Sequence, residues 1–87
     1  MKIAYHRQFL KHYQKRILPN PALVTKFNSR LSLLLANPTN PLLKLHKLQG
    51  SKSSYQAFSI TGDFRVIFKI VGETLRLYDI GTHNQVY

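Results

Sequence analysis

This chain of 87 residues contains no cysteine. Disulfide scaffolds, thiolate zinc sites and cysteine nucleophiles are therefore excluded, and a small domain without such cross-links depends on its hydrophobic core. Only four glycines occur, widely spaced, so a glycine-rich phosphate-binding loop is absent. Long apolar runs are missing as well, because the most apolar stretch covers only residues 31–36. We therefore expect neither a signal peptide nor a transmembrane helix, no membrane association, and a cytoplasmic protein.

Acidic residues are also scarce. Only Asp63, Glu73 and Asp79 oppose thirteen Lys and Arg, which gives a formal net charge of +10. The first 62 residues carry ten of the basic residues and no carboxylate, whereas residues 63–87 carry three residues of each sign. Such a field attracts a polyanion, and nucleic acid is the first candidate.

The apolar content is high enough for a folded domain. Hydrophobic residues make up 44% of the chain and aromatic residues 11%, so it is not a disordered basic tail. A chain of this length buries roughly 60–65% of its unfolded surface around one core. We therefore expect a single domain over residues 1–87, which excludes multidomain enzymes and large cofactor folds.

The first half of the sequence predicts a strand and two helices. Residues 2–5 alternate polar and apolar side chains, and apolar residues then recur at three- and four-residue steps over residues 6–17. Asn20 is placed to cap a second helix that starts at Pro21 and ends near Ala36, before a segment with two prolines. The short connection predicts an antiparallel helical hairpin.

The second half predicts an antiparallel meander. Residues 41–54 are basic and rich in turn-forming residues, and we expect an ordered loop there that is anchored by its leucines. Three strand-like runs follow at residues 55–60, 64–70 and 74–80, joined by short glycine-containing turns.

The middle strand of this meander has two different faces. One face carries only apolar side chains, and we expect the helical hairpin to cover it. Its residues are Phe64, Val66, Phe68 and Ile70. Arg65 then points to the open face of the sheet.

A small set of side chains suits metal-free RNA cleavage. His46 lies in the basic loop, His83 follows the last strand, Arg65 is on the open sheet face, and Tyr87 ends the chain. Such cleavage needs a base for the 2′-hydroxyl, an acid for the 5′-oxygen, and positive charge for the phosphorane. An exposed aromatic ring also offers a stacking surface for an unpaired base. The other two histidines, expected to be structural or surface residues, are His6 and His12.

Three segments of the chain resemble a known toxin family in order and spacing. They are Leu48-Gln-Gly50, the run from Ile60 to Lys69, and the run from Ile80 to Tyr87. They look like the RelE/ParE superfamily of bacterial type II toxin–antitoxin systems, closest to its YafQ and YoeB-like mRNA interferases. The resemblance implies an α+β fold, in which a two-helix hairpin packs on a twisted antiparallel sheet of about four strands in the order β-α-α-β-β-β. It also implies cleavage of mRNA, usually in the ribosomal A site, that leaves a 2′,3′-cyclic phosphate and a 5′-hydroxyl.

The resemblance also implies roles for individual residues. His46 falls where YafQ-like members have a catalytic histidine, and we interpret it as the general base. Arg65 would stabilise the phosphorane, and His83 would protonate the leaving group. Tyr87 matches an aromatic residue that orients the substrate, and Asp63 matches an acidic position able to orient a histidine. No metal or cofactor is implied.

Three lysines are candidates for binding RNA phosphates or ribosomal RNA, namely Lys44, Lys47 and Lys52. Two positions depart from the YafQ-like pattern, since Ser59 replaces a second histidine and Asp79 replaces an arginine. The expected site is therefore a hybrid, in which the arginine of the middle strand replaces the missing positive charge.

Two other interpretations remain open. The chain is also compatible with a ParE-like toxin that binds DNA gyrase and cleaves nothing, although such members lack the pair of histidines. A basic nucleic-acid-binding domain without catalysis fits the composition equally well. For the leading interpretation, the expected partners are mRNA, the ribosome, and an acidic cognate antitoxin that wraps the toxin.

Overall fold

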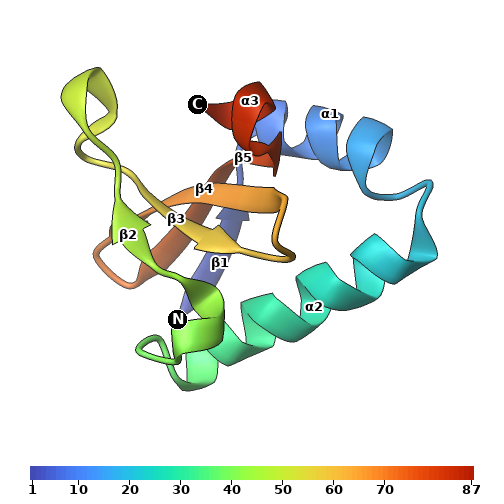
Figure 1. The fold of residues 1–87 in the computed structure, drawn as a ribbon. Helices are drawn as coiled ribbons and strands as arrows, with labels where there is room; N and C mark the ends of the chain where they lie inside the picture. Colours follow the sequence, from blue (N-terminus) through green and yellow to red (C-terminus); the bar gives the residue numbers. More distant parts are fainter.

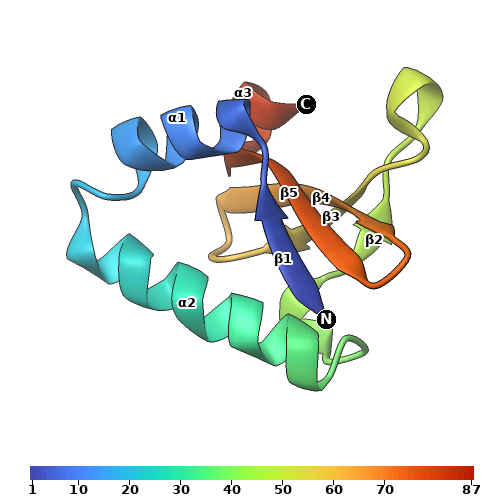
Figure 2. The same cartoon turned by 180° about the vertical axis from the view of Figure 1, so that it is seen from behind.

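The computed structural model describes residues 1–87, which form one five-stranded sheet with two long helices (Figure 1). The elements are β1 (Lys2–Tyr5), α1 (Arg7–Arg16), α2 (Pro21–Ala36), η1 (Pro41–Leu43), β2 (His46–Lys47), η2 (Gly50–Lys52), β3 (Gln56–Ser59), β4 (Phe64–Val71), β5 (Thr74–Thr82) and α3 (His83–Val86). The strand order is β1-β5-β4-β3-β2, and every pair is antiparallel except β1 with β5. Figure 2 shows β1 alongside β5 and the two long helices diverging from their short connection. The α+β fold class expected from the sequence is confirmed.

Side-chain caps define where both long helices begin. The Nδ1 atom of His6 accepts a hydrogen bond from the backbone N–H of Gln8 at 3.1 Å, so His6 is the N-cap of α1. Asn20 caps α2 as predicted, because its side chain accepts hydrogen bonds from the N–H groups of Ala22 and Leu23. Neither helix, nor any other in the chain, is long and apolar enough to cross a membrane.

The main core lies between the sheet and the two long helices. Phe9 of α1, Phe27 of α2 and Phe68 of β4 belong to one cluster of 13 buried residues. Alternation along β4 places Ile67 in a smaller cluster on the opposite face. Ile70 lies on the helix-covered face as predicted and lines a hollow with Leu34 and Leu35 of α2, but 46% of its surface stays exposed, so the cover there is incomplete.

The segment expected to be a loop holds more structure than the sequence indicated. Residues 41–54 contain two short 3-10 helices and the two-residue strand β2, which pairs with β3 through His46 and Ala57. The sheet therefore has five strands rather than about four. A two-residue strand carries no alternation pattern, and its formation depends on pairing with β3, which sequence periodicity does not reveal. Leu43 is fully buried and anchors this segment as expected.

Candidate active site

The last turn of the chain positions two of the expected site residues. Helix α3 begins after Thr82 with a capping box, in which Gln85 Oε1 accepts a hydrogen bond from the Thr82 N–H at 2.8 Å. Val86 is 97% buried, since only 3% of its surface is exposed, and it packs against Ala57 and Ile67 of the sheet. This anchor leaves the side chains at both ends of the turn, His83 and Tyr87, exposed on the open face of the sheet.

Gly81 makes this arrangement sterically possible. A Cβ atom at this position would lie 2.7 Å from Arg16 Nη1 and 2.7 Å from Gln85 Oε1. The same Arg16 nitrogen donates a hydrogen bond to the Ile80 carbonyl at 2.9 Å, which ties α1 to the end of β5. The absence of a side chain at Gly81 thus lets α1 and α3 meet at the end of β5.

Hydrogen bonds define the orientation and tautomer of His46. Its Nδ1 atom lies 2.9 Å from the carbonyl oxygen of Lys44. A carbonyl oxygen only accepts, so Nδ1 carries the proton and Nε2 has the free lone pair when the ring is neutral. The Tyr87 hydroxyl lies 3.0 Å from Nε2 and donates to it. His46 is therefore held with its basic nitrogen toward Tyr87.

Tyr87 lies between the two histidines. The centres of the Tyr87 and His83 rings are 4.4 Å apart, and those of the Tyr87 and His46 rings are 6.2 Å apart, both edge to face. All three line a hollow of about 530 Å³, here named the histidine pocket. Its other lining residues are Lys47, Leu48, Gln49, Ser51 and Lys52. Gln49 and Ser51 were not anticipated as site residues, although Gln49 lies in the Leu48-Gln-Gly50 segment that carries part of the family resemblance.

Arg65 lies close enough to this group to affect its electrostatics. Burial raises the pKa of the Tyr87 hydroxyl above its ordinary value, and the positive charge of Arg65 opposes that shift more weakly. Arg65 Nη1 donates to the carbonyls of Thr61, Gly62 and Phe64. These bonds engage one terminal nitrogen of the guanidinium and leave its other donors free.

Three expected site residues do not line the histidine pocket, namely Arg65, Asp63 and Lys44. The carboxylate of Asp63 makes no hydrogen bond or ion pair with any histidine, and the residue is exposed in the turn between β3 and β4. The Lys44 side chain lines a separate hollow with Arg30 of α2. Of the three lysines expected near the site, Lys47 and Lys52 line the pocket, while Lys44 contributes the backbone carbonyl that orients His46.

Ser59 and Asp79, the two residues that depart from the YafQ-like sequence pattern, are both buried. Ser59 is 3% exposed and is paired across the sheet with Arg65, and its hydroxyl has no hydrogen-bond partner. Asp79 is 8% exposed and accepts hydrogen bonds from Gln8 Nε2 at 2.9 Å and His12 Nδ1 at 2.6 Å. His12 therefore has the structural role expected of it. No group of three His, Asp or Glu side chains is placed to hold a metal ion.

Comparison with known proteins identifies the family. A family model described as the bacterial toxin of type II toxin-antitoxin system, YafQ, matches residues 1–87. The chain belongs to the YafQ toxin family. It is thus a toxin of a type II toxin–antitoxin system, within the RelE/ParE superfamily that the sequence resembled.

Solved structures agree with membership of the YafQ family. YafQ from E. coli strain BL21(DE3) is 28% identical, with 99% of this chain and 97% of that chain covered and a TM-score of 0.80. The toxin in the E. coli DinJ-YafQ complex is also 28% identical, with 99% and 97% covered and a TM-score of 0.76. A YoeB/ParE toxin from Agrobacterium tumefaciens shares the fold at 21% identity, with 95% and 99% covered and a TM-score of 0.81. No curated protein matches the chain.

Proposed function

We propose that this YafQ-family toxin is a metal-independent endoribonuclease that cleaves mRNA on the ribosome and so inhibits translation. The observation that carries the proposal is the placement of His46 and His83 on either side of Tyr87 in one basic pocket. A general base and a general acid at opposite ends of one phosphodiester are what cleavage through the 2′-hydroxyl requires. Membership of the YafQ family, known as mRNA interferases, supports the same conclusion.

His46 acts as the general base in this proposal. Its Nε2 lone pair takes the proton of the 2′-hydroxyl, which replaces the Tyr87 hydroxyl as its hydrogen-bond donor. The Lys44 carbonyl keeps its bond to Nδ1 and stabilises the imidazolium that forms. The 2′-oxygen then attacks phosphorus and closes the 2′,3′-cyclic phosphate.

His83 and Arg65 serve the other side of the reaction. Protonated His83 gives its proton to the departing 5′-oxygen, which becomes a 5′-hydroxyl. The free guanidinium donors of Arg65 stabilise the added negative charge on the phosphorane. Tyr87 orients the substrate by packing against a base or ribose once its hydroxyl is released from His46.

The surroundings of the pocket suit a polyanionic partner. Lys47 and Lys52 line it and are placed to contact phosphates of the mRNA or of ribosomal RNA. The small size of the chain fits an enzyme that uses the ribosome to position its substrate, which places it in the cytoplasm. We also infer a cognate antitoxin, because the related E. coli YafQ is crystallised with DinJ in a toxin–antitoxin complex. The net charge of +10 favours an acidic antitoxin that covers the basic pocket.

Single substitutions in the pocket test the proposal. His46→Ala and His83→Ala should each lower mRNA cleavage by roughly 10²-fold or more, the usual loss when a general acid or base is removed. Cleavage is measured by primer extension on mRNA in a translation reaction, with growth arrest in cells as a second readout. Asn84→Ala is the matched control, because Asn84 is exposed on the same helical turn and outside the pocket.

The same experiment separates the alternatives. Growth arrest with intact mRNA and inhibited DNA gyrase would overturn the nuclease proposal in favour of a ParE-like activity. RNA binding without cleavage or growth arrest would favour the non-catalytic domain. Undiminished cleavage by His83→Ala would remove that residue as the acid.

A further inference from the structure

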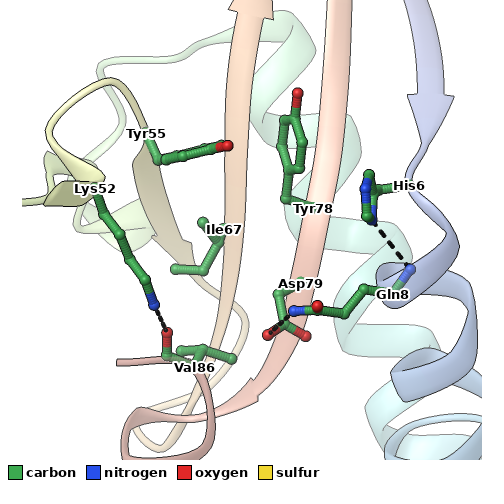
Figure 3. Close-up of a pocket in the computed structure, with 8 residues that line it drawn as sticks. All are labelled: His6, Gln8, Lys52, Tyr55, Ile67, Tyr78, Asp79 and Val86. Carbon is green, nitrogen blue, oxygen red and sulfur yellow. Dashed lines mark hydrogen bonds between the residues drawn. The ribbon is translucent and has the colours of Figure 1, made fainter.

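A second pocket, which shares Lys52 with the histidine pocket, lies on the open face of the sheet. Figure 3 shows the residues that line it. It has a volume of about 260 Å³ and lies between the start of α1 and the strands β4 and β5, and it is here named the aromatic pocket. The residues that give it its character are His6, Gln8, Lys52, Tyr55, Tyr78 and Asp79. The mechanism proposed above does not use it, apart from Lys52, which lines both pockets.

A β-bulge creates the unusual lining of this pocket. Ile67 is paired with Asp79 while the next residue of β4 is paired with Leu77, so Tyr78 has no partner across the ladder. A bulge redirects side chains that regular alternation would send to opposite faces. Tyr78 and Asp79, although consecutive, therefore both line the aromatic pocket, as Figure 3 shows.

Aromatic rings form one wall of the pocket. The Tyr55 and Tyr78 rings are 4.8 Å apart at 80°, and the His6 ring is 5.2 Å from Tyr78. The floor is Ile67, which is only 4% exposed. A rigid, partly apolar slot of this kind suits a planar ring, and stacking on such side chains is how proteins hold unpaired bases.

The opposite wall presents hydrogen-bond acceptors. Gln8 Nε2 donates to Asp79 Oδ2 at 2.9 Å, which leaves Gln8 Oε1 without a partner beside the carboxylate. Asp79 is the only buried carboxylate of the chain. Arg16 Nη1 lies 3.8 Å from its Oδ1 and compensates part of its charge. Lys52 is the only Lys or Arg that lines the pocket, so the pocket suits a base rather than the sugar–phosphate backbone.

Lys52 connects the two pockets. Its Nζ donates to the Val86 carbonyl at 3.1 Å (Figure 3), and Val86 is the last residue of the helical turn that begins at His83. A strand that runs from one pocket to the other passes the ammonium group, which is placed to contact the intervening phosphate. The two pockets are thus arranged like the sites for neighbouring nucleotides.

We propose that the aromatic pocket binds an unpaired mRNA base next to the cleaved bond and favours bases with an exocyclic amino group over uracil. This inference rests on the proposed function for its substrate. Adenine, cytosine and guanine each offer an amino donor to Gln8 Oε1, the acceptor that stays free because both oxygens of Asp79 already accept hydrogen bonds. Uracil has a single ring N–H flanked by two carbonyl oxygens. These oxygens are acceptors themselves and repel the acceptor oxygen of Gln8.

Binding of short uncleavable oligonucleotides tests the inference. The probes are fluorescently labelled 2′-O-methyl tetranucleotides of adenosine, cytidine and uridine, bound to the wild-type toxin and measured by anisotropy. We expect the first two to bind at least fivefold more tightly than the third, the scale of one hydrogen bond. Gln8→Leu should remove that preference, and Tyr55→Leu should weaken all three probes roughly tenfold through lost stacking.

A matched variant controls for general effects on α1. Gln14→Leu makes the same change at an exposed position of α1 outside the pocket and should leave the preference intact. Thermal unfolding of each variant establishes that it is folded, and Gln8, being exposed, can be replaced without loss of core. Equal binding of all three probes by the wild type, or a preference that survives Gln8→Leu, would overturn the inference.

The outcome is separable from that of the nuclease proposal. If the toxin cleaves no RNA but binds the probes with the expected preference, the aromatic pocket stands and the nuclease assignment fails. If Gln8→Leu and the wild type cleave mRNA at the same positions and equal rates, the nuclease stands and the base-binding pocket fails.

Discussion

The hydrogen-bond pair on the two nitrogens of His46 sets the chemistry available to this toxin. A backbone carbonyl fixes the proton on Nδ1, and Tyr87 covers the nitrogen that must act as base. The covering group is a neutral hydroxyl, which a substrate hydroxyl can replace one for one. The free toxin thus holds the proposed general base in the tautomer that the proposed mechanism needs.

The ionisation of Tyr87 gives a pH-dependent prediction. Burial raises its pKa above 10, so the folded state retains the phenolic proton more firmly than the unfolded chain. The resulting stabilisation is complete below the unfolded pKa and is lost as pH rises through the folded value. The test is a spectrophotometric titration of phenolate absorbance at alkaline pH. The absorbance of the wild type minus that of Tyr87→Phe reports Tyr87 alone, and its midpoint should lie above 10.

Thermal unfolding at two alkaline pH values provides an independent check. The wild type should lose more of its Tm than Tyr87→Phe as pH rises past the midpoint for Tyr87. Identical losses in the two proteins, or a midpoint below 10, would contradict the assigned environment of the hydroxyl.

The sequence located most, but not all, of the residues that meet in the histidine pocket. His46, His83 and Tyr87 are brought together there, and their chemical roles remain predictions. Asp63 and Arg65 do not line the pocket, because spacing along the chain determines neither where a turn side chain points nor which carbonyls a guanidinium binds. Lys44 was expected to bind phosphate near the site, but its side chain lies elsewhere and its carbonyl orients His46. Its left-handed backbone, with φ of 47°, comes just before β2 and has no signal in the sequence.

At the level of elements, long periodic segments were predictable and short ones were not. Both long helices and the three main strands follow from apolar spacing, proline positions and caps. Strand β2 and helix α3 have two and four residues, too few for any periodic signal. The bulge at Tyr78 was equally invisible, because it depends on the pairing of β5 with β4. These short features shape both pockets.

Gly81 tests whether docking of the last turn positions the site. Gly81→Ala places a methyl group 2.7 Å from Arg16 Nη1 and Gln85 Oε1, so the ends of both side chains must move and leave their hydrogen bonds to the Ile80 carbonyl and the Thr82 N–H, at about 1 kcal/mol for each bond. If the toxin is the nuclease proposed above, cleavage should fall at a temperature where the variant is still folded, because displacement of α3 moves His83 and Tyr87. Cleavage rates and thermal unfolding are measured together.

Gly62→Ala is the matched control for this change. A Cβ atom at Gly62 meets nothing within 4 Å, so this variant should retain both stability and cleavage. Gly81→Ala with the stability and activity of the wild type would show that docking of α3 does not depend on this close approach.

Across the whole molecule, charge and chemistry are unevenly distributed. The net charge of +10 comes entirely from residues 1–62, whereas His83, Arg65 and Tyr87 lie in the neutral remainder. Strand β2 brings basic residues of the first part against the sheet formed mainly by the second. Attraction of RNA thus depends largely on one part of the chain, and the proposed acid and phosphorane-binding residue come from the other.

This distribution predicts a graded salt dependence for RNA binding. Each phosphate contact with single-stranded RNA contributes a slope of about −0.7 in the plot of log K against log salt concentration. Lys47→Ala and Lys52→Ala should each reduce the magnitude of the wild-type slope by about that amount. Lys26→Ala, an exposed change on α2 remote from both pockets, should leave the slope of anisotropy titrations unchanged. If all three lysine variants changed the slope equally, RNA would be held by the diffuse charge of the molecule and not by the lysines of the pocket.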